Sequence, residues 1–439
     1  MDRIHFIGIG GIGLSALAKF LAGQGAKISG SDISKSEITD DLAVNYNAHI
    51  TIPHHPDAVE GANMVIYSAI IRPNNTEYKR AKELGIKLFS RKEALKFILK
   101  DKKVYAVAGA HGKSTTSAIL SSILQNSNAL IGAISKEFGS NVRVFSNNEV
   151  VFEADESDAS FLNSNPYLAI VTNVEPEHME YYEYDEKKFY QAYRSFLELA
   201  KVRVLNGEDK FLSQQNDLKS IYLYPSNDIR DIEYVLIEGE PHTRFKLKDF
   251  GVFDVFGIGY HIAVDTSLAI LSALELGFDI ETIRENLLKY KGIKKRFDII
   301  QKNGMVVIDD YGHHPTEIKA TLNSIKEYAK LLGIKKIYAI WQPHKYTRTI
   351  DNLHGFVECF EGVDELTILP IWSAGEVEVD IDLKGAFSRY MPIMASRVTR
   401  KDGKVLIINE QNEIIKKYKD SLVVAFGAGD ITYRIRGIL

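Results

Sequence analysis

The feature that most constrains this chain is the segment VYAVAGAHGKSTT, residues 104–116. A short apolar run leads to Gly109, two further residues, Gly112 and then Lys-Ser-Thr-Thr. The pattern predicts a buried strand, a tight turn and a helix whose N-terminus faces the turn, so that backbone N–H groups and the helix dipole can bind phosphate. The first glycine of the general phosphate-loop pattern would fall at Val107, and the loop is therefore a shortened variant.

The residue types in this loop favour an ATP site. The two glycines tolerate positive φ and leave the loop amides accessible. Lys113 is expected to reach the outer phosphates, and the Ser114 hydroxyl is expected to bind Mg²⁺. The predicted ATP-binding residues of the loop are Gly109, Ala110, His111, Gly112, Lys113, Ser114 and Thr115. An apolar stripe between residues 119 and 124 predicts the buried side of the helix, and the serines among these residues are expected to face solvent.

A second glycine-rich turn lies near the start of the chain, in RIHFIGIGGIG. Gly8, Gly10 and Gly13 satisfy G-x-G-x-x-G after a predicted strand, and Asp32 ends the next strand, where dinucleotide-binding units place a ribose-binding carboxylate. The turn recognises the diphosphate of a nucleotide and does not require nicotinamide. A nicotinamide-dependent dehydrogenase is an alternative, but it leaves the phosphate loop without a role. Further strands are predicted at residues 63–70 and 87–90, with a helix around residues 77–84.

Length and composition narrow the class of protein. A chain of 439 residues exceeds what one core usually organises, and a net charge of −4 gives no general electrostatic reason to bind nucleic acid or an anionic membrane. The single cysteine excludes an internal disulfide and favours the cytoplasm. No signal peptide precedes the first strand, and no apolar run approaches the ~20 residues that span a bilayer. The expected partners are small molecules, with no obligate protein partner evident.

Two acidic segments follow predicted strands of the central region, at residues 153–158 and 175–178. Because the carboxyl ends of parallel strands form the ligand edge of a sheet, these groups are expected to face a bound nucleotide. Mg²⁺ needs few protein oxygens when it is bound with ATP, so one carboxylate of the first segment together with Ser114 would suffice. His54 and His55 lack suitably spaced partners, and we interpret them as a surface turn rather than a metal site.

Three strand–glycine–helix beginnings, at Arg3, Val104 and Met305, predict three domains. In the last of them, DDYGHH (309–314) and PHKYTR (343–348) each follow a predicted strand. Strands at 365–370 and 421–427 are expected to complete an open α/β sheet. A basic cluster, residues 294–296, precedes this region and places an arginine where it could reach a γ-phosphate.

Taken together, these motifs resemble the Mur ligases of peptidoglycan precursor synthesis. The resemblance covers essentially the full chain in the family's order and is carried by GIGGIG (8–13), GAHGKSTT (109–116), EADESDASF (153–161), TNVEPEHM (172–179), KKRFD (294–298), DDYGHHPTE (309–317) and PHKYTR (343–348). It implies three α/β domains, each an open, mainly parallel sheet with helices: a Rossmann-like UDP-sugar-binding domain (1–100), a central P-loop ATP-binding domain (101–298) and a Rossmann-like C-terminal domain (299–439) that closes over the nucleotide and binds the amino acid.

Within the family, the first glycine loop and DESDASF are most similar to the alanine-adding branch. The resemblance therefore implies ATP-dependent joining of L-alanine to the lactyl carboxylate of UDP-N-acetylmuramate through an acyl phosphate, with Mg²⁺. A family member that reattaches a recycled peptide is one alternative. An ATP-gated binding module without catalysis is another.

The resemblance also implies residue roles. The expected metal ligands are Ser114, Glu156 and His178, and the expected catalytic residues are Lys113, His178 and Arg296, with Asp310 at the ATP ribose. The expected UDP-sugar-binding residues are Gly8, Gly10, Gly11, Gly13, Asp32 and Ser68. The expected alanine-binding residues are Tyr311, His313, His344, Lys345 and Arg348. Lys345 stands where the family usually has arginine, and Ile262 and Asp265 stand where asparagines usually follow His261, so no adenine contact is predicted.

Overall fold

A computed structural model describes residues 2–439 and divides them into two compact units. The first unit contains the residues through 231 together with 245–255 and 263–291. The second contains 232–244, 256–262 and 292–439. Among the described residues, no helix combines the length and the apolar character needed to cross a membrane.

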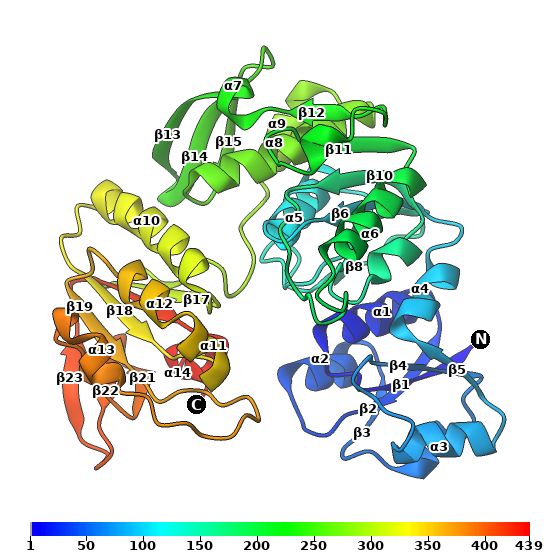
Figure 1. The fold of residues 1–439 in the computed structure, drawn as a ribbon, viewed down its shortest axis with the longest axis horizontal. Helices are drawn as coiled ribbons and strands as arrows, with labels where there is room; N and C mark the ends of the chain where they lie inside the picture. Colours follow the sequence, from blue (N-terminus) through cyan, green and yellow to red (C-terminus); the bar gives the residue numbers. More distant parts are fainter. Residues whose placement is uncertain (1) are drawn as a thin grey trace. The chain divides into compact units, whose positions relative to one another are not determined.

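The first sheet of the first unit has five parallel strands in the order β3-β2-β1-β4-β5 (Figure 1). Its strands are β1 (Arg3–Ile7), β2 (Lys27–Ser31), β3 (His49–Thr51), β4 (Met64–Tyr67) and β5 (Lys87–Ser90). The connecting helices are α1 (Ile12–Gly23), α2 (Glu37–Asn45), α3 (Thr76–Glu83) and α4 (Arg91–Ile98). The strand order changes direction between β1 and β4, so the loop after β1 lies where open α/β sheets bind their ligands.

The second sheet of this unit has seven strands in the order β12-β11-β10-β6-β9-β7-β8, and only β8 is antiparallel to its neighbour. Its strands are β6 (Lys103–Ala108), β7 (Asn128–Leu130), β8 (Val142–Arg143), β9 (Glu149–Glu153), β10 (Pro166–Val171), β11 (Val202–Asn206) and β12 (Ile221–Leu223). The helices around it are α5 (Lys113–Ile123), α6 (Glu186–Leu199), α7 (Pro225–Asp228), α8 (Tyr260–Glu275) and α9 (Ile280–Leu287). Strand β6 pairs with both β10 and β9, so the phosphate loop leaves the middle of the sheet.

The serines of α5 do not face solvent, and our expectation for them was wrong. Ser117, Ser121 and Ser122 are fully buried. Glu137 and Arg143 contact the serines from outside the helix: Ser122 Oγ contacts Glu137 Oε2, and Arg143 Nη2 donates to Ser121 O at 2.7 Å. The hydroxyls of Ser121 and Ser122 donate to carbonyl oxygens one turn earlier, which satisfies them inside the helix and lets them be buried.

A three-stranded sheet, β13-β14-β15, was not expected from the sequence. It consists of β13 (Ile229–Ile237), β14 (Glu240–Leu247) and β15 (Val252–Phe256). The last strand leads into α8, much of which is buried.

The second unit contains a six-stranded sheet in the order β16-β17-β24-β18-β19-β20, in which only β16 is antiparallel. Its strands are β16 (Asp298–Gln301), β17 (Val306–Asp310), β18 (Ile337–Trp341), β19 (Glu365–Ile368), β20 (Ile393–Met394) and β24 (Leu422–Phe426). Helices α10 (Pro315–Leu332) and α12 (Leu353–Cys359) lie side by side on this sheet (Figure 1). The remaining helices are α11 (Tyr346–Asp351), α13 (Leu383–Ala386) and α14 (Ile431–Ile435). An antiparallel sheet of β21 (Arg397–Lys401), β22 (Lys404–Ile408) and β23 (Ile414–Tyr418) lies in the chain between β20 and β24 and was also not expected.

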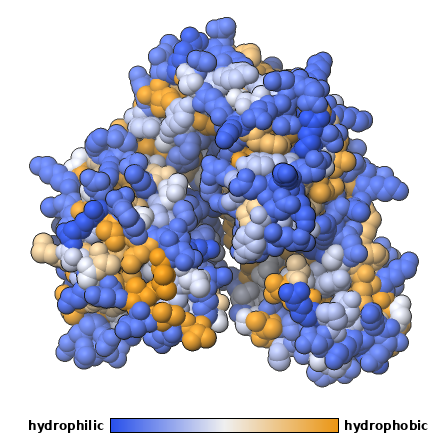
Figure 2. Space-filling view, in the orientation of Figure 1, coloured by the Kyte–Doolittle hydropathy of each residue, from blue (hydrophilic) through white to orange (hydrophobic). Residues whose placement is uncertain are grey.

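Aromatic side chains fill the core under α12. The ring of Trp341 lies 4.7 Å from that of Phe356 and 5.3 Å from that of Phe387, measured between centroids. Cys359, the chain's only cysteine, belongs to the same buried cluster, and its thiol donates to Phe356 O. The molecular face drawn in Figure 2 is mostly hydrophilic with some apolar patches, and the largest fully buried side chains are aromatic.

Candidate active site

The phosphate loop is held open by neighbouring backbone and side chains of the first unit. Gly109 has φ 137° and Gly112 has φ 82°, values that non-glycine residues rarely adopt. A Cβ atom at Gly109 would lie 2.1 Å from Thr172 Oγ1. The His111 amide donates to Asn173 Oδ1 at 3.0 Å, and the Thr172 and Asn173 side chains donate to His111 O. The end of β10 therefore fixes the loop in the shape that the sequence predicted.

The first two residues of α5 contact two different carboxylates. Lys113 Nζ donates to the carbonyls of Gly109 and Ala110 and lies 2.8 Å from Glu156 Oε1. The Ser114 hydroxyl donates to Glu153 Oε1 at 2.9 Å. The lysine that is expected to reach a phosphate thus lies folded over the loop, and Glu153 contacts the predicted Mg²⁺ hydroxyl more directly than Glu156 does.

Three potential metal ligands converge beside this loop. Single ligand atoms of Glu156, Glu177 and His178 lie within 4.8 Å of one another. Glu156 Oε2 is buried without a hydrogen-bond partner, and a buried acceptor of that kind normally has one. Two carboxylates and an imidazole, one carboxylate oxygen being unsatisfied, fit a divalent cation. Glu156 and His178 were expected here from the resemblance, whereas Glu177 was not.

Two adjacent carboxyl groups in this loop have pKa values shifted in opposite directions. Burial raises the pKa of Glu156, and the neighbouring Lys113 ammonium only partly offsets this effect. Burial would also raise the pKa of Asp155, but the Arg91 guanidinium and the Ser157 amide together hold it below its ordinary value. The charged form of Asp155 is thus favoured by its partners, whereas the charged form of the adjacent Glu156 is disfavoured by burial.

The first glycine loop is organised by Asp32. Its carboxylate accepts hydrogen bonds from the amides of Gly10 and Ile33, both at 2.8 Å. Gly8 has φ 82° and lies against Ser68, whose Cβ would be 3.1 Å from a Cβ placed at Gly8. The predicted UDP-sugar residues therefore do lie together: Gly8, Gly10, Gly11, Gly13, Asp32 and Ser68. In this structure the Asp32 carboxylate is bound to the backbone of the loop, and so it stabilises the conformation of the loop.

His54 is not part of a simple surface turn. Its Nδ1 lies 2.8 Å from Ser31 Oγ and 3.6 Å from Glu77 Oε1, and Glu77 is fully buried against His5. His55 is exposed, as expected of the turn. Among the described residues, only the cluster around Glu156 brings three potential metal ligands together, and the histidine pair does not belong to it.

In the second unit, the predicted residues after β17 form one network with Arg296. Glu317 Oε2 accepts a hydrogen bond from the His313 amide at 3.0 Å, and Glu317 Oε1 lies 3.7 Å from Arg296 Nη1. Asp310 lies beneath this network and is only 5% exposed. Its carboxylate accepts hydrogen bonds from the Phe297 and Gly312 amides, and burial raises its pKa to about 6. Asp310 thereby fixes the loop that carries Arg296.

The predicted alanine-binding residues extend this network to the end of β18. The ring of His313 lies 5.3 Å from that of Tyr311 and 6.0 Å from that of His344. Arg348 Nη1 donates to His344 Nδ1 at 3.2 Å. Burial, aided by the Arg348 charge, lowers the pKa of His344 to about 4, so this ring is neutral at neutral pH. Lys345 directly precedes α11 and has φ 70°.

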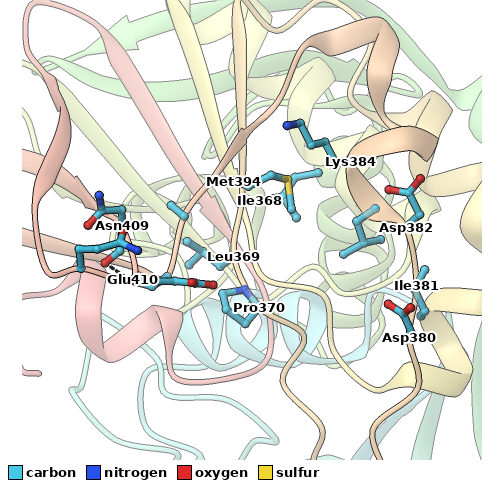
Figure 3. Close-up of a pocket in the computed structure, with 14 residues that line it drawn as sticks. Ile368, Leu369, Pro370, Asp380, Ile381, Asp382, Lys384, Met394, Asn409 and Glu410 are labelled. Atoms are coloured by element: carbon cyan, nitrogen blue, oxygen red, sulfur yellow. Dashed lines mark hydrogen bonds between the residues drawn. The ribbon is translucent and has the colours of Figure 1, made fainter.

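A separate cavity of about 660 Å³ lies at the ends of β19 and β20 in the second unit (Figure 3). Asp380, Asp382 and Glu410 line it together with apolar side chains such as Leu369 and Met394. None of the residues predicted from the sequence contributes to its lining. The candidate site is therefore identified from the side chains that its loops bring together and not from the presence of a large cavity.

Sequence reasoning missed three residues around the phosphate loop. Glu153 and Glu177 lie in segments that were recognised as acidic, but spacing alone did not select them. Asp265 lies so close to Gly112 that a Cβ atom there would be 2.5 Å from Asp265 Oδ1. Asp265 was noted from the sequence only because it stands where the family usually has asparagine, and its contact with Gly112 joins residues that are far apart in the chain.

Comparison with protein families gives three consecutive matches. The Mur ligase family catalytic domain matches residues 3–103, the Mur ligase middle domain matches residues 107–238, and the Mur ligase glutamate ligase domain matches residues 295–429. These ranges follow the three predicted domains in order, while the precise boundaries at residues 100 and 298 remain predictions.

Individual relatives are similar over their full length. A UDP-N-acetylmuramate–L-alanine ligase of Campylobacter curvus is 56% identical over 438 residues, covering 100% of both chains. The enzyme of the same name from Helicobacter pylori strain P12 is 54% identical and covers 99% of this chain and 96% of the relative. Among solved structures, a UDP-N-acetylmuramate–alanine ligase from Thermotoga maritima superimposes with a TM-score of 0.83 at 25% identity, covering 100% of this chain and 98% of that one. A murein peptide ligase from Psychrobacter arcticus has a TM-score of 0.64 at 18% identity, covers 100% and 98% of the two chains, and is similar in fold.

Proposed function

Because the chain belongs to the Mur ligase family, we propose that it joins L-alanine to the lactyl carboxylate of UDP-N-acetylmuramate while ATP is converted to ADP and phosphate. The single observation that carries the proposal is the end-to-end similarity to alanine ligases at 54–56% identity. The phosphate loop supports it, because a dehydrogenase would have no use for Lys113. The buried lone thiol of Cys359 suits a reducing compartment, and the cytoplasm supplies ATP.

The reaction needs an activated carboxylate, since a carboxylate in water does not acylate an amine. Transfer of the γ-phosphoryl group of ATP to a lactyl carboxylate oxygen gives an acyl phosphate and releases ADP. The loop amides, the N-terminus of α5 and Lys113 stabilise the negative charge that is transferred. We propose that Lys113 leaves Glu156 and the loop carbonyls to contact the phosphates.

The residues fit a bound Mg²⁺. Ser114, Glu156 and His178 would hold it, with Glu177 as a further ligand and Glu153 orienting the Ser114 hydroxyl. When bound, the cation neutralises charge on the phosphates. His178 has φ 52°, a strained conformation that the loop maintains, and strain of this kind is common at functional residues.

The amino acid is assigned to the network in the second unit. The guanidinium of Arg348 can pair with both oxygens of the alanine carboxylate, and the neutral ring of His344 does not repel it. Tyr311, His313 and Lys345 complete this group, and we propose that Arg296 contacts the γ-phosphate and Asp310 the ATP ribose. The neutral amine then attacks the acyl phosphate, phosphate leaves, and a base accepts the amine proton; His178 can be this base only when its ring does not bind the cation.

The deciding assay is release of phosphate from ATP with each substrate omitted in turn. We expect release only when UDP-N-acetylmuramate and L-alanine are both present. Arg348→Ala should raise the KM for L-alanine about tenfold or more and lower kcat, because a bidentate carboxylate contact is lost, with little change in the KM for ATP. Release without L-alanine, or an Arg348→Ala defect confined to ATP, would contradict the assignment.

A further inference from the structure

Arg91 joins two loops of the first unit that are far apart in the sequence. It is the first residue of α4, and Ser90 and Glu93 form a capping box that fixes this end of the helix. Its two terminal nitrogens donate to Asp155 Oδ2 at 3.2 and 3.3 Å. Asn163 Nδ2 donates to Lys92 O at 3.0 Å, so the same helix end holds the segment a second time.

The carboxylate that Arg91 holds closes the turn around Glu156. Asp155 Oδ1 accepts a hydrogen bond from the Ser157 amide at 3.0 Å, so this contact spans the residue between them. The carbonyl of Asp155 accepts from the Phe161 amide. Fixing the Asp155 side chain therefore fixes the backbone that presents Glu156, with its unsatisfied Oε2, to the cation site.

The same guanidinium also lies over the first glycine loop. A Cβ atom at Gly13 would be 3.1 Å from Arg91 Nη1 and 3.5 Å from Nε. Gly13 is in the first turn of α1, the end of a helix that attracts anions. Since a guanidinium has five N–H donors, Arg91 can keep Asp155 and still donate to a phosphate at this turn.

We propose that Arg91 is a positioning residue that couples the diphosphate site at the first glycine loop to the cation site at Glu156. The inference rests on the proposed function for the identity of the diphosphate ligand. A diphosphate at α1 restricts Arg91, the restricted guanidinium orders the Asp155 turn, and the ordered turn presents Glu156 to the cation. The coupling is positive, so UDP-N-acetylmuramate strengthens cation binding, and by reciprocity the cation strengthens UDP-N-acetylmuramate binding by the same factor.

The test is titration calorimetry with Mn²⁺ as the probe, on the full chain, with and without saturating UDP-N-acetylmuramate. In the unaltered protein we expect the Kd for Mn²⁺ to fall about fivefold or more when the UDP-sugar is present. Arg91→Met should bring this ratio close to one, and Arg91→Lys should restore part of it, because an ammonium keeps the charge but not the fork. The matched control is Arg80→Met. Arg80 is a cation of α3 in the same unit and pairs with Glu60 and Glu83, so its loss should leave the ratio of the two Kd values for Mn²⁺ unchanged.

The outcomes separate this inference from the proposed function. If the unaltered protein binds both ligands with a ratio of one, or if Arg91→Met keeps the full ratio, the coupling is wrong and the proposed function stands. If UDP-N-acetylmuramate does not bind the unaltered protein at all, the proposed function itself is wrong. Thermal melting of each variant shows whether it is folded, and Arg91→Lys provides the same comparison with the charge retained should Arg91→Met fail to fold.

Discussion

The two glycine loops of the first unit both join a strand to the N-terminus of a helix, but the positive side chain beside each loop comes from a different place. The loop after β6 carries its own cation, Lys113, in the first turn of its own helix, and neutral side chains, Thr172 and Asn173, hold it in shape. In the loop after β1, a carboxylate, Asp32, holds the backbone, and the nearby cation is Arg91 from a different helix. A cation within the loop can stabilise a phosphoryl group during transfer. A cation from another helix can instead link the loop to contacts elsewhere in the unit.

Lys113→Met should produce the largest loss of activity and tests directly whether the two loops form separate sites. Removing one well-aimed donor to a transferred group typically costs about 10²–10³-fold in kcat. Because Lys113 belongs to the second loop alone, the affinity for UDP-N-acetylmuramate, measured by calorimetry, should change little. Lys187→Met, on the exposed start of α6, is the control. An equal loss of UDP-sugar affinity in Lys113→Met would mean that the two loops do not form separate sites.

Glycine-to-alanine substitutions in the two loops provide a second test, with a smaller expected effect that is measured as a loss of stability. Gly112→Ala places a side chain at φ 82° with its Cβ 2.5 Å from Asp265 Oδ1, so we expect a loss of about 1–3 kcal/mol in stability together with weaker ATP binding. Gly11 has φ −70°, and a Cβ placed there would lie 3.7 Å from Gly8 O, so Gly11→Ala should cost under about 1 kcal/mol. Thermal melts of the two variants make the comparison, and equal losses would show that the second loop is not the more constrained one.

The smallest effect concerns pH and the adjacent pair Asp155 and Glu156. Because the pKa of Asp155 is lowered on folding, its stabilising contribution is present above the ordinary carboxyl pKa and is lost as pH falls through the folded value. Because the pKa of Glu156 is raised, its contribution is present below the ordinary value and is lost as pH rises through the folded value.

Asp155→Asn should therefore reduce the loss of stability on the acid side, and Glu156→Gln should reduce the loss toward neutral pH. Denaturation midpoints across the acid to neutral range measure both effects, with Glu180→Gln as an exposed control. If the two variants shifted the profile in the same direction, the opposite environments assigned to these carboxyl groups would be wrong.

The local parts of this architecture could be predicted from the sequence. The strand, turn and helix around Gly109 and the loop after β1 were predicted correctly, because glycine spacing and apolar runs act over a few residues. The contact between Arg91 and Asp155 spans 64 residues, and a single arginine at a helix start has no motif. The S-x-x-E pattern at Ser90 could have located the helix end and thereby placed Arg91 at its first position.

The burial of the α5 serines illustrates why other parts could not be predicted. Hydroxyls that donate to carbonyls of their own helix can be buried as readily as exposed. The residues that contact Ser121 and Ser122 from outside the helix, Arg143 and Glu137, lie in later segments whose packing no local pattern indicates.

The β13–β15 and β21–β23 sheets were missed although each contains a two-residue hairpin turn, Glu238-Gly239 and Asp402-Gly403, with positive φ at both residues. Asp-Gly is a typical hairpin pair and could have located the turn between β21 and β22.

The environment of Cys359 makes the protein convenient for site-directed labelling. Burial raises the pKa of this thiol to about 12, and as the only cysteine it leaves the chain without a reactive competitor for thiol reagents. A cysteine introduced at an exposed position of each unit would then be the preferred site for a fluorescent dye. Energy transfer between two such dyes would measure whether the distance between the two units changes when substrates bind.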